Sequence, residues 1–304
     1  MTPPPSPSIR PKHWIEYAAA RFLASLVASL PDHAALGLGQ RLADFGFSVI
    51  RYRRSEAIRR ILSVFAPAMD RSTATAIARE SFRNLVLTLF EGMRVSRVDR
   101  AWIAQHIDDA GGFETVRAHC ASGQGAVLAV PHMGSWELAG ASCARMGIPL
   151  FSISARFKNP LVDEWLRQQR TAAGLEMLTR GTDPLAAVPR LLKRGRCFAI
   201  LPDVRHPRPA LAIPFLGGTA NIAPGMALFA RLGNAPIFPC ILTRLPGGRH
   251  RFRVGRPIFP NPEESRDEDL RRMTAAVMAI IEEAIRAQPG QWFWFNKRWI
   301  LDPL

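Results

Sequence analysis

The sequence predicts an α/β protein in which helices flank a mostly parallel central sheet and a helical segment precedes that sheet. Up to about residue 107 the apolar residues recur with the period of an amphipathic helix. Beyond a break at 108–112, short apolar runs alternate with helical stretches along the chain. Strands that alternate with helices in this way are typical of a parallel sheet covered on both faces.

The first part of the chain divides into a flexible N-terminus, predicted at 1–13, and a helical, membrane-associating region, predicted at 14–107. Within it, 14–30 carries an apolar helical stripe and is interpreted either as a core helix or as a helix lying in a membrane interface. Glu16 and Arg21 interrupt its apolar character, and a spanning helix needs about 20 mostly apolar residues. A transmembrane helix is therefore the weaker interpretation.

Residues 108–304 supply the elements of the predicted α/β domain. Strands are predicted at 125–130, 148–154, 175–178, 197–201, 211–215, 235–243 and 251–258. Helices are predicted at 136–146, 160–174, 183–195, 225–233 and about 263–287. The stretch 203–224 has no regular pattern apart from its one short strand. Because it is rich in proline yet apolar, we interpret it as an ordered wall rather than a linker.

The charge balance is strongly basic, with 40 Lys+Arg against 25 Asp+Glu and a formal net charge of +15. Lysine occurs at only four positions, so arginine supplies almost all of this excess. Arginine suits nucleic acid, anionic lipid headgroups or an acidic protein partner, and charge alone does not choose among them. The sequence contains no helix-turn-helix, zinc-finger or aromatic-rich RNA-binding pattern, which disfavours nucleic acid.

The four cysteines are isolated, and none belongs to a CxxC pair. This spacing predicts buried, reduced thiols rather than a zinc site or a disulfide framework, and it fits a cytoplasmic setting.

The stretch AVPHMGSWELAG (129–140) places His132 and Glu137 where a buried strand ends. Ligands of open α/β sheets collect at the carboxyl ends of strands. Ser135 is a predicted N-cap, so Glu137 falls in the first helical turn and can fold back toward the imidazole. A carboxylate on one ring nitrogen leaves the other free to take a proton from a hydroxyl. The alternative is a glutamate that stabilises the helix dipole beside an incidental histidine. No second histidine stands at metal-ligand spacing.

The pattern HMGSWE resembles the H-x4-D/E motif of the glycerolipid acyltransferase superfamily. Its surroundings are similar to the bacterial lipid A biosynthesis acyltransferases, the lauroyl and myristoyl transferases. The similar stretches lie at 82–94, 154–170, 201–239 and 291–299. The chain departs from the family pattern after Pro202-Asp203, where Val204-Arg205-His206-Pro207 follow, and in the turn at 221–224.

This resemblance implies a glycerolipid acyltransferase-like fold and transfer of a fatty acyl chain from an acyl-carrier-protein thioester to a hydroxyl of a lipid A precursor. No cofactor or metal is implied. His132 is the implied general base, Glu137 its partner, and backbone N–H groups at the helix start hold the oxyanion. Arg156, Arg170 and Asp203 are the implied substrate-binding residues, and we expect the last two to form a coupled pair.

The implied partners are acyl carrier protein, a glycolipid acceptor and an anionic membrane surface, at the cytoplasmic face of the inner membrane. Two alternatives remain open at the level of sequence. One keeps the chemistry and changes the acceptor to another glycolipid or a phospholipid. The other is a basic, non-catalytic membrane-binding protein. The aromatic residues at 292–299 are compatible with either a core cluster or a membrane-interface belt.

Overall fold

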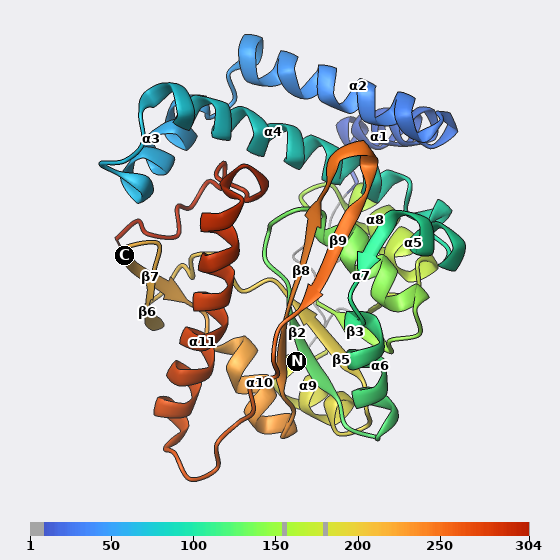
Figure 1. Ribbon diagram of the computed structural model, residues 1–304. Helices are drawn as coiled ribbons and strands as arrows, with labels where there is room; N and C mark the ends of the chain where they lie inside the picture. Colours follow the sequence, from blue (N-terminus) through green and yellow to red (C-terminus); the bar gives the residue numbers. More distant parts are fainter. Residues whose placement is uncertain (1–8, 154–156, 179–181, 304) are drawn as a thin grey trace.

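The computed structural model describes residues 9–153, 157–178 and 182–303 and shows an α/β fold with a mostly parallel central sheet (Figure 1). The sheet has seven strands in the order β1-β9-β8-β2-β5-β3-β4, and every neighbouring pair is parallel except β8 and β9. Its strands are β1 (Ile107–Asp109), β2 (Ala126–Ala129), β3 (Leu150–Ser152), β4 (Glu176–Met177), β5 (Cys197–Ile200), β8 (Ile237–Arg244) and β9 (His250–Val254). The predicted fold class is confirmed.

Helices cover both faces of this sheet. They are α6 (Gly112–Ala121), α7 (Trp136–Arg145), α8 (Pro160–Ala172), α9 (Pro184–Leu192), α10 (Gly225–Gly233) and α11 (Arg266–Ala287). Alternate residues of β2 enter two different apolar clusters: Val127 and Ala129 pack in one, Ala126 and Leu128 in the other. A strand buried on both sides reads as a continuous apolar run, which is why GAVLAV identifies β2 so clearly.

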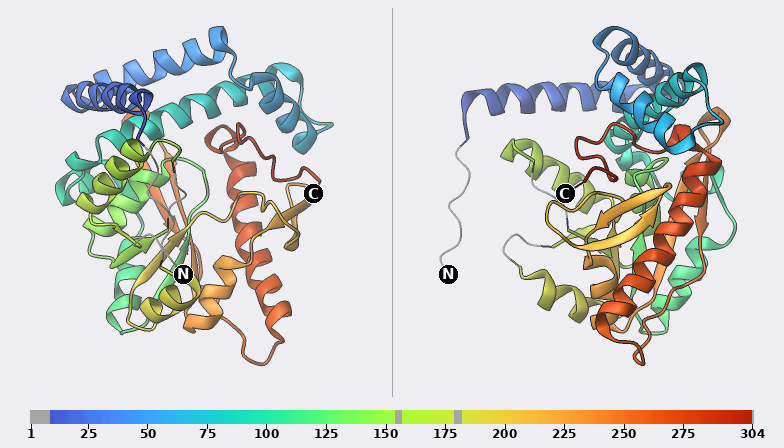
Figure 2. Two further views of the ribbon diagram at one scale, coloured as in Figure 1. Left: turned by 180° about the vertical axis from the view of Figure 1, so that it is seen from behind. Right: turned by 90° about the vertical axis from the view of Figure 1, so that its left-hand side faces the viewer.

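A layer of helices lies over the end of the sheet at which β2 finishes (Figures 1 and 2). It comprises α1 (Pro11–Ser29), α2 (Asp32–Phe45), the π-helical turn η1 (Gly46–Ile50), α3 (Arg54–Phe65) and α4 (Arg71–Met93). The short turn η2 (Val95–Arg97) and α5 (Arg100–His106) then lead into the sheet. Helix α1 begins at Pro11, inside the range predicted to be flexible, because proline is pre-organised for the first helical position.

The stretch 203–224 contains one strand more than the sequence pattern predicts. Strands β6 (Leu211–Phe215) and β7 (Gly218–Ile222) form an antiparallel hairpin apart from the main sheet. The two residues between them, Leu216 and Gly217, both have positive φ, as a type I′ turn requires. The segment is therefore ordered, as predicted, and the Gly217–Gly218 pair in the sequence marks the turn of its hairpin.

The C-terminal aromatic residues belong to the core. Trp292, Trp294, Phe295 and Trp299 are each at most 5% exposed, and the three indoles pack against one another. They follow the turn η4 (Pro289–Gln291) and lie against α3, where the buried Arg60 donates to the carbonyl oxygens of Trp294 and Asn296. This decides between the two interpretations of the cluster in favour of packing. The four cysteines are buried, as predicted.

Candidate active site

His132 lies just beyond the end of β2, and Asp203 lies just beyond the end of β5. The two strands are parallel neighbours in which Ala129 pairs with Ile200. His132 follows Ala129 by as many residues as Asp203 follows Ile200. The parallel register therefore places both side chains together at the carboxyl ends of the two strands. His132 and Asp203 thus meet because their strands are neighbours in the sheet, not because they are close in sequence.

Asp203 makes two hydrogen bonds to His132, one with its imidazole and one with its backbone N–H. Its Oδ1 lies 2.9 Å from Nδ1 of His132, and its Oδ2 accepts the backbone N–H of His132 at 2.7 Å. The indole Nε1 of Trp292 donates to Oδ2 at 2.8 Å. The side chain of Asp203 is fully buried, whereas that of His132 is 25% exposed. With Nδ1 occupied, Nε2 of His132 has no hydrogen bond to the described part of the chain, and it is the nitrogen left for a substrate.

The surroundings of Asp203 keep its carboxylate ionised. Burial by itself raises the pKa of Asp203, but the charge and hydrogen bonds of His132 and the Trp292 indole outweigh it and hold that pKa below its ordinary value. An ionised carboxylate on Nδ1 fixes the tautomer with the proton on Nδ1, so that Nε2 is an acceptor.

Glu137 does not partner His132, which corrects the sequence prediction. It forms a two-bond ion pair with Arg170 of α8, at 2.6 Å for Nη2–Oε1 and 3.2 Å for Nε–Oε2. Burial alone lowers the pKa of Arg170, and the hydrogen bond and charge of Glu137 raise it above its ordinary value. Helix α7 begins at Trp136, and its first turn directs Glu137 to the last turn of α8.

The expected pairing of Arg170 with Asp203 is wrong for the same reason. The structure exchanges the partners of the two predicted pairs, giving His132–Asp203 and Glu137–Arg170. Arg156, the third predicted substrate-binding residue, lies outside the described residues.

The loop between His132 and α7 is clamped by backbone hydrogen bonds. The carbonyl oxygen of His132 accepts from Phe293, Gly134 donates to Gln291, and Ser135 donates to Leu242. Ser135 is the N-cap, as predicted, although its hydroxyl makes no capping bond. Because the N–H groups of Gly134 and Ser135 are occupied, neither is free to act as one of the expected oxyanion donors.

Gly134 is required by this clamp. Its φ is +59°, and a Cβ there would meet the carbonyl oxygen of Leu242 at 1.6 Å. No side chain fits so close to another backbone, so the glycine of HMGSWE has a steric explanation.

A buried polar network from α4, absent from our sequence-based prediction of the site, supports the same loop. Asn84 and Thr88 donate to the carbonyl oxygen of Gly134 at 3.0 and 2.8 Å. Arg244 of β8 bonds both of these side chains and also Glu91. The available signal was the helical spacing of polar residues 84, 88 and 91 within an otherwise apolar stretch.

The described residues contain no group of three or more His, Cys, Asp or Glu side chains placed to hold a metal ion. The cavity directly beside His132 and Asp203 has a volume of about 10 Å³, room for about one water molecule.

The family model for bacterial lipid A biosynthesis acyltransferases matches residues 6–300. The chain belongs to this family. Among its curated relatives, a phosphatidylinositol mannoside acyltransferase of Mycolicibacterium smegmatis is 23% identical over 91% of this chain and 89% of its own length. Its counterpart in Mycobacterium tuberculosis is 23% identical over 70% of this chain, an alignment that spans 66% of that relative.

Two further proteins are similar to this chain. A lipid A biosynthesis acyltransferase of Haemophilus influenzae is 24% identical over 60% of this chain and 56% of its own length. The crystal structure of the 1-acyl-sn-glycerophosphate acyltransferase PlsC from Thermotoga maritima shares 16% identity, with a TM-score of 0.38 over 84% of this chain and 96% of that one. Membership of the family identifies the protein as an acyltransferase that acts on lipid acceptors.

Proposed function

We propose that this family member transfers a fatty acyl chain from an acyl-carrier-protein thioester to a hydroxyl of a lipid A precursor. The observation that carries the proposal is the His132–Asp203 pair. Asp203 holds Nδ1 of His132, and Nε2 has no hydrogen-bond partner among the described residues. This is the arrangement that a general base for a hydroxyl requires.

In the proposed reaction, Nε2 of His132 takes the proton of the acceptor hydroxyl as its oxygen attacks the thioester carbonyl. Asp203 stabilises the imidazolium that forms. When the tetrahedral intermediate collapses, the new ester C–O bond is retained and the C–S bond breaks. The proton on Nε2 then passes to the departing carrier thiolate, which restores the neutral base. The step needs no acyl-enzyme, because the hydroxyl attacks the donor directly.

We assign Asp203 to positioning His132 rather than to binding substrate. Glu137 holds Arg170 in one orientation, since a two-bond ion pair fixes the plane of a guanidinium group. Arg170 is 21% exposed in its side chain and keeps a route to an anionic group of the substrate. Arg156 stays a proposed phosphate ligand on the basis of sequence alone.

The proposed attachment to an anionic membrane surface rests on the N-terminal helices. Among the described residues, no helix is long and apolar enough to cross a bilayer. Helix α1 buries Ala24 and Val27, while Ile15 and Phe22 are 71% and 73% exposed. The apolar exposure continues at the end of α2 and in η1 with Phe45, Val49 and Ile50. A helix that exposes large apolar residues beside arginines suits the interfacial alternative that the sequence left open.

A second acceptor class has specific support. Two of the relatives described above are named for acylation of phosphatidylinositol mannoside, a different glycolipid from lipid A. We therefore keep another glycolipid acceptor as the second candidate, with the same His132 chemistry.

Acyl carrier protein is the proposed donor because it is acidic and the chain carries a formal charge of +15.

The test is acyl transfer by purified His132→Ala protein, supplied with acyl carrier protein thioester and, in parallel, lipid A precursor or phosphatidylinositol mannoside. We expect a loss of at least about 10²-fold in kcat, because the base is removed. His119→Gln is the matched control, since His119 lies on α6 and contacts Gly125 at the opposite end of β2. Undiminished transfer by folded His132→Ala protein would refute the mechanism, and transfer to neither lipid by the parent protein would refute the proposed acceptors.

A further inference from the structure

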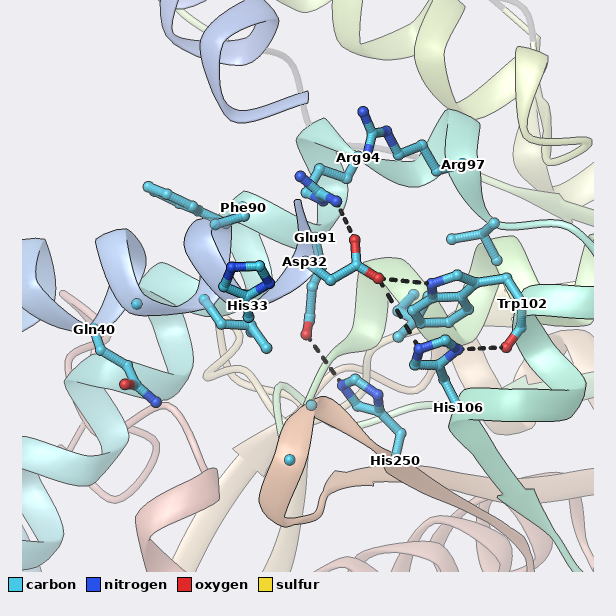
Figure 3. A pocket seen from close by; sticks show the side chains of 17 residues that line it. Asp32, His33, Gln40, Phe90, Glu91, Arg94, Arg97, Trp102, His106 and His250 are labelled. Carbon is cyan, nitrogen blue, oxygen red and sulfur yellow. Dashed lines mark hydrogen bonds and ion pairs between the residues drawn. The ribbon is translucent and has the colours of Figure 1, made fainter. Parts of the chain in front are cut away.

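A second cavity, distinct from the His132 centre, opens between α2, α4, α5 and the tip of the β8–β9 hairpin at η3 (Pro246–Gly248) (Figure 3). Its volume is about 540 Å³, within the range of about 300–1,000 Å³ that is usual for small-molecule sites. Neither His132 nor Asp203 lines it. The His132–Asp203 pair therefore does not account for this cavity.

Two of the side chains that line the cavity, Glu91 and His250, have buried polar atoms without a hydrogen-bond partner. Oε1 of Glu91 is shared by Arg244 and by Nε2 of His250, which lies 3.1 Å away. Oε2 of Glu91 and Nδ1 of His250 are buried and have no hydrogen-bond partner among the described residues. His250 is only 1% exposed. Buried polar atoms without partners are costly, so such a pair in a cavity indicates that a ligand completes their bonding.

The two unsatisfied atoms differ in the hydrogen bonds that they can make. Burial raises the pKa of Glu91, but Arg244 and His250 outweigh this effect and bring the pKa below its ordinary value. Ionised Glu91 can only accept hydrogen bonds. Nε2 of His250 lies 3.1 Å from Oε1 of Glu91, an acceptor, and 3.1 Å from Nη1 of Arg244, a donor. Nδ1 of His250 therefore accepts or donates according to the tautomer of the ring.

These two atoms select among ligand classes. A fatty acyl chain would cover Oε2 and Nδ1 without bonding to them, and a phosphate would meet a carboxylate. Arg244 already neutralises Glu91 at its other oxygen, so no cation is needed. A neutral ligand with hydroxyl groups fits all three constraints, because a hydroxyl can donate to Oε2 and can either donate to Nδ1 or accept from it.

The side walls supply the remaining features of a sugar site. Trp102 and His106 are stacked, with ring centroids 4.3 Å apart and planes within 8°. Asp32 fixes both rings from α2, and Arg94 in turn holds Asp32 (Figure 3). Sugars present a C–H face that packs on aromatic rings and hydroxyl groups that bond to carboxylates and imidazoles.

We infer that this cavity is a saccharide-binding site, with Glu91 and His250 as hydrogen-bond partners of sugar hydroxyls and Trp102 as the packing surface. The sugar has two possible sources, the headgroup of the glycolipid acceptor or a free saccharide. Arg244 links the site to the catalytic loop, because it bonds Glu91 and also Thr88, which donates to Gly134. Sugar binding itself does not depend on acyl transfer.

Gly37 offers a sharp test, because it lines the cavity and a Cβ there would have nothing within 4 Å. We expect a leucine at this helical position to occupy part of the cavity, whereas an alanine leaves most of the space open. Both changes raise helix propensity, so neither is expected to unfold α2. Gly37→Ala is thus the matched control for Gly37→Leu.

The experiment titrates methyl α-mannoside and N-acetylglucosamine into the parent protein and both variants, with binding followed by isothermal calorimetry. For the parent we expect saturable binding of at least one sugar with a Kd on the order of 1 mM. Gly37→Leu should weaken it about tenfold or more, and Gly37→Ala should leave it within about twofold. Inorganic phosphate and laurate should not displace the sugar.

Absence of saturable sugar binding would overturn the inference, as would binding unchanged by Gly37→Leu. Displacement by phosphate or by laurate would assign the cavity to an anion or to an acyl chain instead. If Gly37→Leu also raises the KM for the glycolipid acceptor, the headgroup is the source, and an unchanged KM indicates a free saccharide. Because calorimetry needs no turnover, an inactive protein that binds sugar would refute the proposed transfer and leave this inference intact.

Discussion

Asp203 Oδ1 lies 2.9 Å from Nδ1 of His132, while the other oxygen of the same carboxylate accepts the backbone N–H of that histidine. One buried side chain thus fixes both the ring and the main chain of the proposed base. Glu137, which the sequence offered for this role, holds Arg170 instead. Substitutions of Asp203 and of Glu137 should therefore lower the rate of acyl transfer to different extents.

We predict that Asp203→Asn lowers kcat for acyl transfer by about 10²–10⁴-fold, because an amide does not stabilise the imidazolium and can fix the wrong tautomer. Glu137→Gln should cost about tenfold or less, since its effect reaches the site only through the orientation of Arg170. Steady-state kinetics on both variants, with folding checked by circular dichroism, decide the matter. A larger loss for Glu137→Gln than for Asp203→Asn would restore Glu137 as the partner of the base.

The observed ion pairs predict a specific pattern of energetic coupling. In a double-mutant cycle on the free energy of unfolding, Glu137→Ala and Arg170→Ala should couple by about 1 kcal/mol or more, because each removes the partner of the other. Arg170→Ala and Asp203→Ala share no bond and should be additive within about 0.5 kcal/mol. Coupling confined to the second pair would contradict the arrangement described here.

Acid should destabilise the protein through its buried carboxylates. The pKa values of Asp203 and Glu91 both lie below their ordinary values in the folded state. The unfolded chain therefore binds more protons than the native one, so their contribution is present above pH about 4–5 and is lost as the pH falls further.

Urea unfolding between pH 7 and about pH 3 measures this loss. Asp203→Asn should remove part of the pH dependence, and Glu263→Gln on the exposed surface is the control. A parent protein whose free energy of unfolding is level across this range would be inconsistent with the lowered pKa values.

Membrane attachment should depend on the exposed apolar residues of α1. Ile15→Ser combined with Phe22→Ser should reduce partition to vesicles containing anionic phospholipid by about tenfold or more, since each side chain contributes about 1.5–3 kcal/mol when buried. Leu185→Ser is the matched control, because Leu185 is 56% exposed on α9, at the opposite end of the molecule (Figure 1). Equal sedimentation of the double variant and the control would locate the attachment elsewhere.

The sequence by itself determined the order of helices and strands, the alternation that makes a parallel sheet, and the position of His132 at the end of β2. These features are local, because apolar periodicity and turn residues act over a few positions. Both can be recognised within one short segment such as GAVLAVPHMGSWE. Strand β1 was not predicted because it has only 3 residues and pairs at the edge of the sheet, and β7 because its sequence GTANI contains no apolar run.

Only the tertiary structure decided which carboxylate meets the imidazole. Glu137 is close to His132 in the chain, but it lies on a helix whose first turn faces α8. Asp203 is distant in the chain, yet the parallel register of β2 and β5 carries it to the same edge. The same reason explains the cavity lined by Glu91 and His250, because its walls come from α2, α4, α5 and the β8–β9 hairpin. Contacts between distant segments depend on strand order and helix packing, which local periodicity does not encode.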